Sequence, residues 1–370
     1  MTIKVLVVDD SALMRKVLRE ILTAEPGFEV ETARDGEDAL ERIRELDPDV
    51  VTLDINMPRM DGLTCLAHIM SESPRPVVMV SSLTEQGALA TFEALELGAV
   101  DYVAKPGGTV SLNLREVADE IRAKVRAAAG ARTRRRAGAA AAPARPAPAR
   151  PARRAGARAA ARRPAGRGDG TGLVLVGVST GGPGTLEVIL TALPEDFPWP
   201  VLVAQHMPAR FTRVFAERLD RRCALAVREV QRAMPLEPGQ IAIAQGDADV
   251  LVQRRLGRTT AVTTDPDESL LWHPSVERMV RSALEACPPE RLVGVQLTGM
   301  GYDGAEAMAE LHRRGGRTIA ESEESAVVFG MPRELIERGG ADVVLPRERI
   351  AAQLCEWLMG APEAAQATGG

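Results

Sequence analysis

An Ala- and Arg-rich segment in the middle of the chain most constrains how it folds. Residues 127–170 contain 19 Ala, 12 Arg, 6 Gly and 5 Pro, and no Val, Ile, Leu, Met or aromatic residue. Such a segment buries too little apolar surface to offset the conformational entropy lost on ordering. We therefore predict a disordered linker over 127–170, which divides the 370-residue chain into two folded domains, residues 1–126 and 171–370.

The charge of the chain is divided in the same way. The formal net charge is −5 overall, but it is −9 over residues 1–126, +11 over 127–170 and −7 over 171–370. Because both predicted domains are acidic, a uniformly basic nucleic-acid-binding protein is excluded. The arginines of the linker are interpreted as a solvated spacer, and contact with nucleic acid or with an acidic face of a domain is the alternative.

Cysteine usage and hydropathy indicate where the protein works. The four cysteines, at positions 65, 223, 287 and 355, are far apart and form no C-x-x-C pair. This spacing argues against a disulfide framework or a zinc ribbon and suits a reducing cytoplasm. No run of 18 or more apolar residues suggests a membrane span, and the N-terminus MTIKVLVVDD has no signal-peptide pattern. We expect a cytoplasmic protein that does not insert into membranes.

Short apolar runs alternate with amphipathic segments in both domains. In the first, strands are predicted at Lys4–Val8, Val50–Leu53, Val77–Val80 and Tyr102–Ala104, and helices at Ser11–Thr23, 36–46, 62–72 and 86–97. In the second, strands are predicted at Leu173–Val178, Val201–Gln205, Val293–Thr298 and Thr318–Ala320, and helices at 182–193, 211–221, 275–286 and 304–314. The alternation predicts an α/β fold of two doubly wound parallel-sheet domains. Sheets of this kind place their sites at the carboxyl ends of strands.

Polar residues stand where the strands of the first domain end. Asp9 and Asp10 follow the first strand, Asp54 follows VVTL, and Lys105 follows the last strand. Carboxylates brought together repel one another unless a cation neutralises them, and oxygen ligands of this sort suit Mg²⁺. A carboxylate beside Mg²⁺ can attack a phosphoryl group while the metal and a lysine balance the transferred charge. Each acid taken alone is better explained as a helix cap or a solvated loop residue, and only the set together indicates a site.

The runs VLVVDDS, LDINMPRMDG, VMVSS and DYVAKP make nearly all of residues 1–125 resemble the receiver domain of bacterial response regulators. The resemblance implies a flavodoxin-like fold with Asp54 as the phospho-acceptor. The other site residues that it implies are the Mg²⁺ ligands Asp9, Asp10, Asp54 and Asn56 (through its carbonyl) and the switch residues Ser81, Tyr102 and Lys105. Among the switch residues, the hydroxyl would contact the phosphoryl group, the lysine would balance its charge, and the tyrosine would shift on activation.

The run LVLVGVSTGGPGTLEVIL predicts a strand, a glycine-rich turn and a helix in the second domain. Within it Gly177-Val178-Ser179-Thr180-Gly181 fits G-x-S-x-G, a turn that exposes a serine hydroxyl at the end of a strand. The helix that begins near Gly182 directs free amide groups and a positive dipole end at the turn. A turn of this kind also cradles a phosphate or a dinucleotide, and that alternative stays open although the full G-x-G-x-x-G is absent.

A serine nucleophile requires a base and an acid that orients it. His206 follows the strand VLVAQ and Asp303 lies in the loop after VGVQL, so both can converge with Ser179 at one edge of the sheet. The α/β-hydrolases have the order Ser, Asp, His, which would require His273 or His312 as the base instead. His273 stays a weaker alternative, and His312 is expected on the surface of a helix.

The runs VGVSTGG, AQHMP, LTGMGYDG and VVFGMPREL make the second domain similar to the chemotaxis-specific protein-glutamate methylesterases. In that family a receiver domain and a linker precede a Rossmann-like esterase domain, as predicted here. The resemblance implies Ser179 as nucleophile, His206 as general base, Asp303 as orienting acid and the Met300 N–H in the oxyanion hole. It implies no cofactor for the esterase reaction. Two departures, Glu321 in place of a common glutamine and the run LLWHPSVERMV, are expected to bear on substrate recognition.

The resemblance also implies a function and partners. The enzyme would demethylate glutamate methyl esters on methyl-accepting chemoreceptors and deamidate receptor glutamines, and a chemotaxis histidine kinase would phosphorylate its receiver. The unphosphorylated receiver is expected to cover the esterase site, and phosphorylation is expected to shift it away. Three other hypotheses remain: a transcription factor, a degenerate esterase that serves as a scaffold, and a nucleotide-binding output domain. The absence of a helix-turn-helix pattern in 171–370 weighs against the first.

Overall fold

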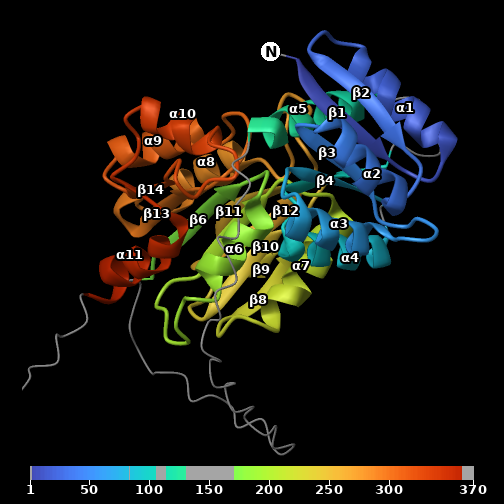
Figure 1. Cartoon of the computed structure of the whole chain (residues 1–370). Coiled ribbons are helices and arrows are strands. Elements are labelled where there is room, and N and C mark those ends of the chain that lie inside the picture. Colours follow the sequence, from blue (N-terminus) through green and yellow to red (C-terminus); the bar gives the residue numbers. More distant parts are fainter. Residues whose placement is uncertain (1, 83, 106–113, 131–170, 361–370) are drawn as a thin grey trace, which may run out of the picture.

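The computed structural model describes residues 2–82, 84–105, 114–130 and 171–360. They form two parallel sheets, one in each domain, with helices packed on both faces (Figure 1). The two doubly wound parallel-sheet domains predicted from the sequence are thereby confirmed. The predicted linker lies outside the described residues from position 131 onward, as does the end of the chain after position 360.

The first domain has five parallel strands in the order β2-β1-β3-β4-β5, which is the flavodoxin-like order. Its strands are β1 (Ile3–Val8), β2 (Phe28–Ala33), β3 (Val50–Asp54), β4 (Val77–Ser81) and β5 (Asp101–Ala104). Its helices are α1 (Ala12–Thr23), α2 (Gly36–Leu46), α3 (Gly62–Glu72), α4 (Glu85–Leu97) and α5 (Leu114–Gly130). The central strands β3 and β4 are buried along their whole length because helices cover both faces of the sheet.

The second domain has seven parallel strands in the order β15-β14-β13-β6-β7-β10-β8. These strands are β6 (Leu173–Val178), β7 (Val201–Gln205), β8 (Ala226–Val230), β10 (Gln240–Ala244), β13 (Leu292–Gln296), β14 (Arg317–Glu321) and β15 (Val343–Leu345). The helices are α6 (Gly182–Leu190), α7 (Ala209–Asp220), α8 (Val276–Ala286), α9 (Ala305–Arg313), α10 (Met331–Glu337) and α11 (Arg347–Met359), with a 3₁₀ turn at Pro289–Arg291. A small antiparallel sheet joins β9 (Met234–Pro235), β11 (Asp249–Arg255) and β12 (Arg258–Thr264).

Two elements of the first domain differ from the sequence prediction. No strand is predicted at Phe28–Ala33, whose burial is broken by exposed Glu29 and Glu31. Helix α5 continues to Gly130, so the expected start of the linker at residue 127 is wrong. The reason is that Ala128 is fully buried beside Ile121 and Val125 in the core of the domain, although its local composition is that of the linker.

The two domains pack against each other through aromatic side chains. Phe92 of α4 lies 5.4 Å from Phe215 and 6.2 Å from Phe211 of α7, measured between ring centroids. Tyr102 of β5 stacks on Phe211, with centroids 4.6 Å apart and the rings nearly parallel. Figure 1 shows this arrangement, in which α4 lies beside α7. The apolar cores of both domains are thus continuous across the contact.

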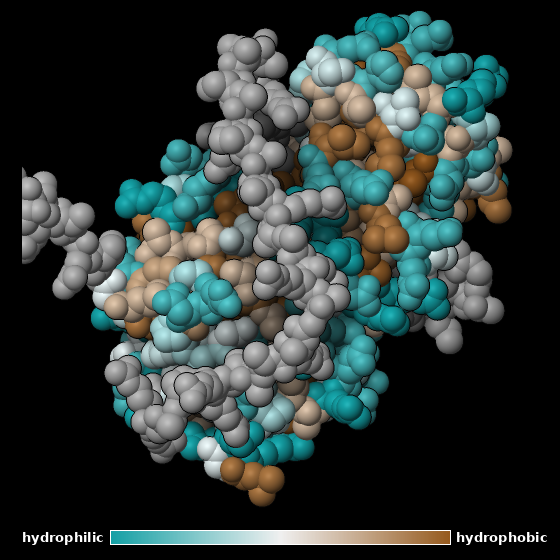
Figure 2. Space-filling view, turned by 90° about the horizontal axis from the view of Figure 1, so that it is seen from below, coloured by the Kyte–Doolittle hydropathy of each residue, from teal (hydrophilic) through white to brown (hydrophobic). Residues whose placement is uncertain are grey.

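Hydrophilic residues cover most of the face seen in Figure 2, and hydrophobic residues appear in patches between them. Among the helices that the structure describes, none is both long enough and apolar enough to cross a membrane.

Candidate functional site

The candidate esterase site lies where the connections of the second sheet reverse direction. From β6 the chain passes to β7 on one side, and from β13 it passes to β14 on the other, so the switch point lies between β6 and β13. Ser179 follows β6, and its N–H donates to the carbonyl of Thr298, which follows β13, at 2.9 Å. The N–H of His206, which follows β7, donates to the carbonyl of Val178 at 3.1 Å. Three strand ends therefore meet at the edge where doubly wound sheets bind ligands.

The turn that carries Ser179 depends on glycine. Gly181 has φ +77°, and a Cβ there would lie 2.5 Å from the Cβ of Val327. The next residue, Gly182, donates its N–H to the Ser179 carbonyl at 2.8 Å and begins α6. Gly181 thus has both a left-handed conformation and a close neighbour, which explains why the second glycine of the G-x-S-x-G pattern is needed.

His206 and Asp303 form a buried pair. The Nε2 atom of His206 lies 2.9 Å from Oδ2 of Asp303, and both side chains are less than a tenth exposed. A carboxylate only accepts hydrogen bonds, so in the neutral ring Nε2 carries the hydrogen and Nδ1 carries the lone pair. Nδ1 is buried and has no hydrogen-bond partner among the described residues. It is the nitrogen left to accept a proton.

The Asp303 carboxylate is held by the N-terminus of α8. The N–H groups of Val276 and Glu277 donate to it at 2.7 and 3.0 Å, and the Ser275 hydroxyl donates at 3.1 Å. Burial alone would raise the pKa of Asp303, but the hydrogen bond and charge of His206 and these amides hold that pKa below its usual value. The group is therefore an anion that accepts from the imidazole. Nothing in the sequence around Ser275 singled out this role, because it depends on a contact 28 residues away.

The two alternative histidines are engaged elsewhere. Nδ1 of His273 lies 3.0 Å from Oδ1 of Asp249, and His312 on α9 lies 3.2 Å from a carboxylate oxygen of Asp342. The histidine that the structure brings to the strand ends beside Ser179 is His206.

Aromatic side chains border the candidate site on the side of the α8 loop. Trp272 lies parallel to the His206 ring, with centroids 5.8 Å apart, and Tyr302 packs edge-on against Trp272. Tyr302 and Leu271 are exposed, so this edge of the site is apolar and open to solvent. The run LLWHPSVERMV, which departs from the family pattern, therefore lies beside His206.

The loop after β13 supplies a free amide. The Gly299 carbonyl accepts the N–H groups of Gly330 and Met331, at 3.1 and 2.9 Å, which fixes the peptide that follows. The N–H of Met300 has no acceptor within the described part of the chain. Glu321, in contrast, has no exposed surface and bonds the Thr298 N–H. The Glu321 side chain is enclosed by the core and therefore presents no surface to a substrate.

A second candidate site lies at the switch point of the first sheet, between β1 and β3. Asp9, Asp10 and Asp54 each place a carboxylate oxygen within 4.8 Å of the others. The Lys105 ammonium lies 2.7 Å from Asp54 and 3.1 Å from Asp9. Burial, with the nearby charge of Asp9, raises the pKa of Asp54 against the opposing effect of Lys105. The site is thus a partly neutralised cluster with oxygen ligands that fit a hard divalent cation.

The remaining predicted residues of this domain lie around the cluster or behind it. The Asn56 N–H approaches Oδ1 of Asp54 at 3.4 Å. Ser81 is buried at the end of β4, where the Thr91 hydroxyl donates to its oxygen at 2.9 Å. Tyr102 is buried against the second domain, as described above, and its hydroxyl has no partner among the described residues.

The first domain also reaches the nucleophile turn directly. Asp101, at the start of β5, is buried; burial raises the pKa of its carboxyl, while Lys124, 3.6 Å away, and the nearby Thr180 side chain lower it. Val327, which fills the space beside Gly181, packs against the core of the first domain. The first domain therefore covers one side of the turn that carries Ser179. Neither Asp101 nor Thr180 carries a sequence signal for this contact.

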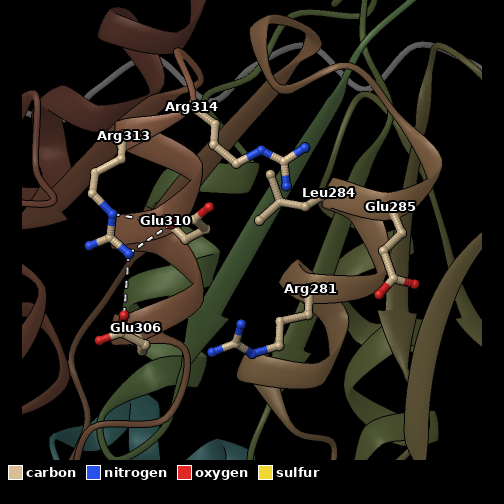
Figure 3. Close-up of a pocket in the computed structure, with 7 residues that line it drawn as sticks. All are labelled: Arg281, Leu284, Glu285, Glu306, Glu310, Arg313 and Arg314. Atoms are coloured by element: carbon tan, nitrogen blue, oxygen red, sulfur yellow. Dashed lines mark hydrogen bonds and ion pairs between the residues drawn. The ribbon is translucent and has the colours of Figure 1, made fainter.

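A separate hollow of about 230 Å³ lies between α8 and α9 (Figure 3). Its lining carries charges of both signs and comprises Arg281, Leu284, Glu285, Glu306, Glu310, Arg313 and Arg314. It includes none of the candidate site residues.

Comparison with known proteins gives the families that the two domains match. Residues 174–354 match the family described as CheB methylesterase, and residues 5–115 match the response regulator receiver domain. A solved structure, the Thermotoga maritima CheB methylesterase catalytic domain, is 38% identical and covers 50% of this chain and 98% of that chain, with a TM-score of 0.49.

Curated relatives match the whole length of the chain. The protein-glutamate methylesterase/protein-glutamine glutaminase 3 of Rhodospirillum rubrum is 56% identical over 366 residues, 99% of either chain. The protein-glutamate methylesterase/protein-glutamine glutaminase 2 of Rhodopseudomonas palustris is 54% identical and covers 96% of this chain and 98% of that protein. With its receiver domain and its CheB methylesterase domain, the chain belongs to the protein-glutamate methylesterase/protein-glutamine glutaminase family.

Proposed function

We propose that this protein hydrolyses glutamate methyl esters on chemoreceptors, and deamidates receptor glutamines, with Ser179, His206 and Asp303 as its triad. The observation that carries the proposal is the buried pair of His206 and Asp303, 2.9 Å apart, at the strand ends that also carry Ser179. The names of the full-length relatives support the choice of substrate.

The proposed reaction gives each of these groups one role. Ser179 Oγ attacks the ester carbonyl while His206 Nδ1 takes the hydroxyl proton. The Met300 N–H stabilises the oxyanion, and Asp303 stabilises the imidazolium. The imidazolium then protonates the leaving methoxide, which departs as methanol. Water attacks the acyl-enzyme with His206 again as base, and this releases a glutamate carboxylate and regenerates the serine.

The receiver cluster supports phosphorylation at Asp54 by a chemotaxis histidine kinase. Asp9, Asp10, Asp54 and the carbonyl of Asn56 would hold Mg²⁺, which when bound neutralises the charge gathered on the phosphoryl group. Lys105, which already contacts Asp54, balances the remaining charge. The donor set of carboxylates within 4.8 Å of one another suits this cation.

Regulation follows from the contact between the domains. With the receiver packed on α7, and with its core against Val327 beside the nucleophile turn, access of the receptor substrate to Ser179 is limited. Phosphorylation shifts the receiver toward an arrangement that releases the turn, which couples a local charge to a change in population. The enzyme thereby serves adaptation in a chemotaxis pathway within the cytoplasm.

Release of methanol from methylated receptor tests the proposal, measured with and without a small-molecule phosphodonor. We expect the phosphodonor to stimulate the wild-type enzyme and Ser179→Ala to abolish turnover, because the nucleophile is lost. Ser269→Ala, at an exposed serine of the same domain, is the matched control and should behave as wild type. Normal methanol release by Ser179→Ala would refute the triad, and no release by any variant would favour a scaffold.

A further inference from the structure

The triad does not use Glu321, although this side chain is a fully buried acid close to it. Glu321 is the last residue of β14, beside the end of β13. Its Oε2 accepts the Thr298 N–H at 2.8 Å, and its Oε1 accepts the Ser325 hydroxyl at 2.7 Å. The Ser325 oxygen in turn accepts the N–H of Arg347 at 2.9 Å. Both carboxylate oxygens are therefore committed to fixed donors.

Thr298 connects this carboxylate to the nucleophile turn. Its carbonyl accepts the Ser179 N–H at 2.9 Å, and its hydroxyl donates to the carbonyl of Thr180 at 2.9 Å. The Val328 N–H donates to the same hydroxyl at 2.9 Å. The chain then continues through Gly299 to Met300. One residue thus holds the backbone on both sides of the nucleophile and precedes the free amide.

We propose that Glu321 is a positioning residue for the esterase reaction, which holds Thr298 so that the nucleophile turn and the Met300 loop keep a fixed separation. The proposal rests on the proposed role of Ser179. Without an acceptor at this point the buried Thr298 N–H would be unpaired, and the loop would relax to satisfy it. Catalysis by oriented groups is sensitive to shifts of this kind, since about 1 Å of misplacement can cost about 100-fold in rate.

The hydrogen-bond pattern also predicts which substitutions of Glu321 keep Thr298 in place. In Glu321→Gln the amide oxygen still accepts the Thr298 N–H, and the amide nitrogen faces the Ser325 oxygen, which can accept. In Glu321→Asp the charge stays, but the side chain is one methylene shorter and cannot reach both donors. Burial raises the pKa of Glu321 against the hydrogen bonds of Ser325 and Thr298 and the charge of Arg347, while Glu348 raises it further. We therefore expect that removing the negative charge of Glu321, with its hydrogen bonds kept, does not by itself disturb Thr298.

The test uses the full-length protein with a phosphodonor and compares Glu321→Ala, Glu321→Asp and Glu321→Gln in the methanol-release assay. We expect kcat to fall about 10- to 100-fold in the alanine and aspartate variants, with KM for receptor nearly unchanged. Glu321→Gln should restore kcat to near the wild-type value. Asp342→Ala is the matched control: Asp342 accepts the Thr318 N–H at 2.6 Å near the other end of β14, away from Ser179.

Each outcome decides a separate point. If Glu321→Ala does not fold, the comparison of the aspartate and glutamine variants carries the test, because both keep a polar group of similar size. Wild-type kcat in Glu321→Asp, or an equal loss of kcat in Asp342→Ala, would overturn the positioning role. Loss of kcat in Glu321→Gln would overturn it too, since only the charge is removed. Ser179→Ala run beside these variants tests the nucleophile itself, so failure of the proposed function is recognised separately.

Discussion

The two nitrogens of His206 have different surroundings, and this difference sets the chemistry at the residue scale. Nε2 donates to a carboxylate to which three other protein groups also donate, whereas Nδ1 has no hydrogen-bond partner among the described residues. In the triad of trypsin-like proteases the acid binds Nδ1 and the serine faces Nε2. The proposed triad here has the opposite assignment. What matters in both cases is that the acid fixes the tautomer in which the other nitrogen is a base.

Asp303→Asn is predicted to lower kcat by about 1,000- to 10,000-fold, the scale seen when a triad acid becomes an amide. The amide can donate to Nε2, which moves the imidazole hydrogen to Nδ1 and removes the base. The measurement is methanol release at saturating receptor. Asp342→Asn, which alters the carboxylate beside His312, is the control and should leave kcat unchanged. An active Asp303→Asn enzyme would contradict the tautomer argument.

The same substitution has a pH signature in stability. The folded state holds the pKa of Asp303 below its ordinary value, so the carboxylate contributes stability above the unfolded pKa of about 4. That contribution is lost as the pH falls through the folded pKa. Asp303→Asn should therefore be less stable than wild type at neutral pH and should approach it in acid. A stability difference that did not change with pH would show that the charge of Asp303 is not what the α8 N-terminus holds.

At the scale of elements, the strands that carry the site are those whose sequences are least ambiguous. β6 and β7 are fully buried apolar runs bounded by glycine or proline, and their predicted bounds agree with the structure. The edge strand β2 is half exposed and its sequence FEVETA gives no continuous apolar run. The end of α5 has linker composition and is helical because of tertiary burial alone. The contact of Thr298 with Glu321 joins residues 23 positions apart, so no local pattern predicts it.

The turn between β6 and α6 gives an element-scale prediction. Gly181→Ala forces a side chain into a residue at φ +77° and against Val327, so we expect the domain to lose about 1–3 kcal/mol of stability. Gly184→Ala on α6 is the matched control, because a Cβ there meets nothing within 4 Å. It should raise stability by about 0.5–1 kcal/mol through helix propensity. All three tryptophans lie in the esterase domain, so denaturation followed by their fluorescence reports this domain. Equal stability of the two variants would contradict the strained turn.

At the scale of the whole molecule, each domain keeps its site at the switch point of its own sheet, and β5 connects the two. Lys105, which contacts the phospho-acceptor candidate Asp54, follows β5 directly. Within the same strand Tyr102 stacks on Phe211 of α7, and Asp101 is buried near Thr180 of the nucleophile turn. A change in charge at Asp54 is therefore separated from Ser179 by one short strand. Because the sequence pattern of each domain is complete in itself, it indicated candidate residues for each site, Tyr102 among them, but not the contacts that join the two domains.

The ion pairs at the rim of the domain contact give the last prediction. Glu96 of α4 pairs with both Arg218 and Arg222 on the esterase side, and these arginines also pair with Glu187. Glu96→Arg places a third cation against the two, because Glu187 balances only one of their two positive charges. A single exposed ion pair contributes little stability, so the loss of the Glu96 pairs matters less than the new repulsion between arginines. We expect this repulsion to weaken the domain contact and to decrease as salt is added.

The unphosphorylated Glu96→Arg enzyme should release methanol faster than wild type, and its stimulation by the phosphodonor should be smaller. Both effects arise because the arrangement in which the receiver covers the Ser179 turn is destabilised relative to the one that releases the turn. Glu93→Arg changes an exposed residue of the same helix with the same charge and is the control. Added salt should bring Glu96→Arg back toward wild type by screening the repulsion. Unchanged basal activity at low salt would mean that the contact between α4 and α7 does not limit access to Ser179, and that coverage by Asp101 and Val327 alone has to account for it.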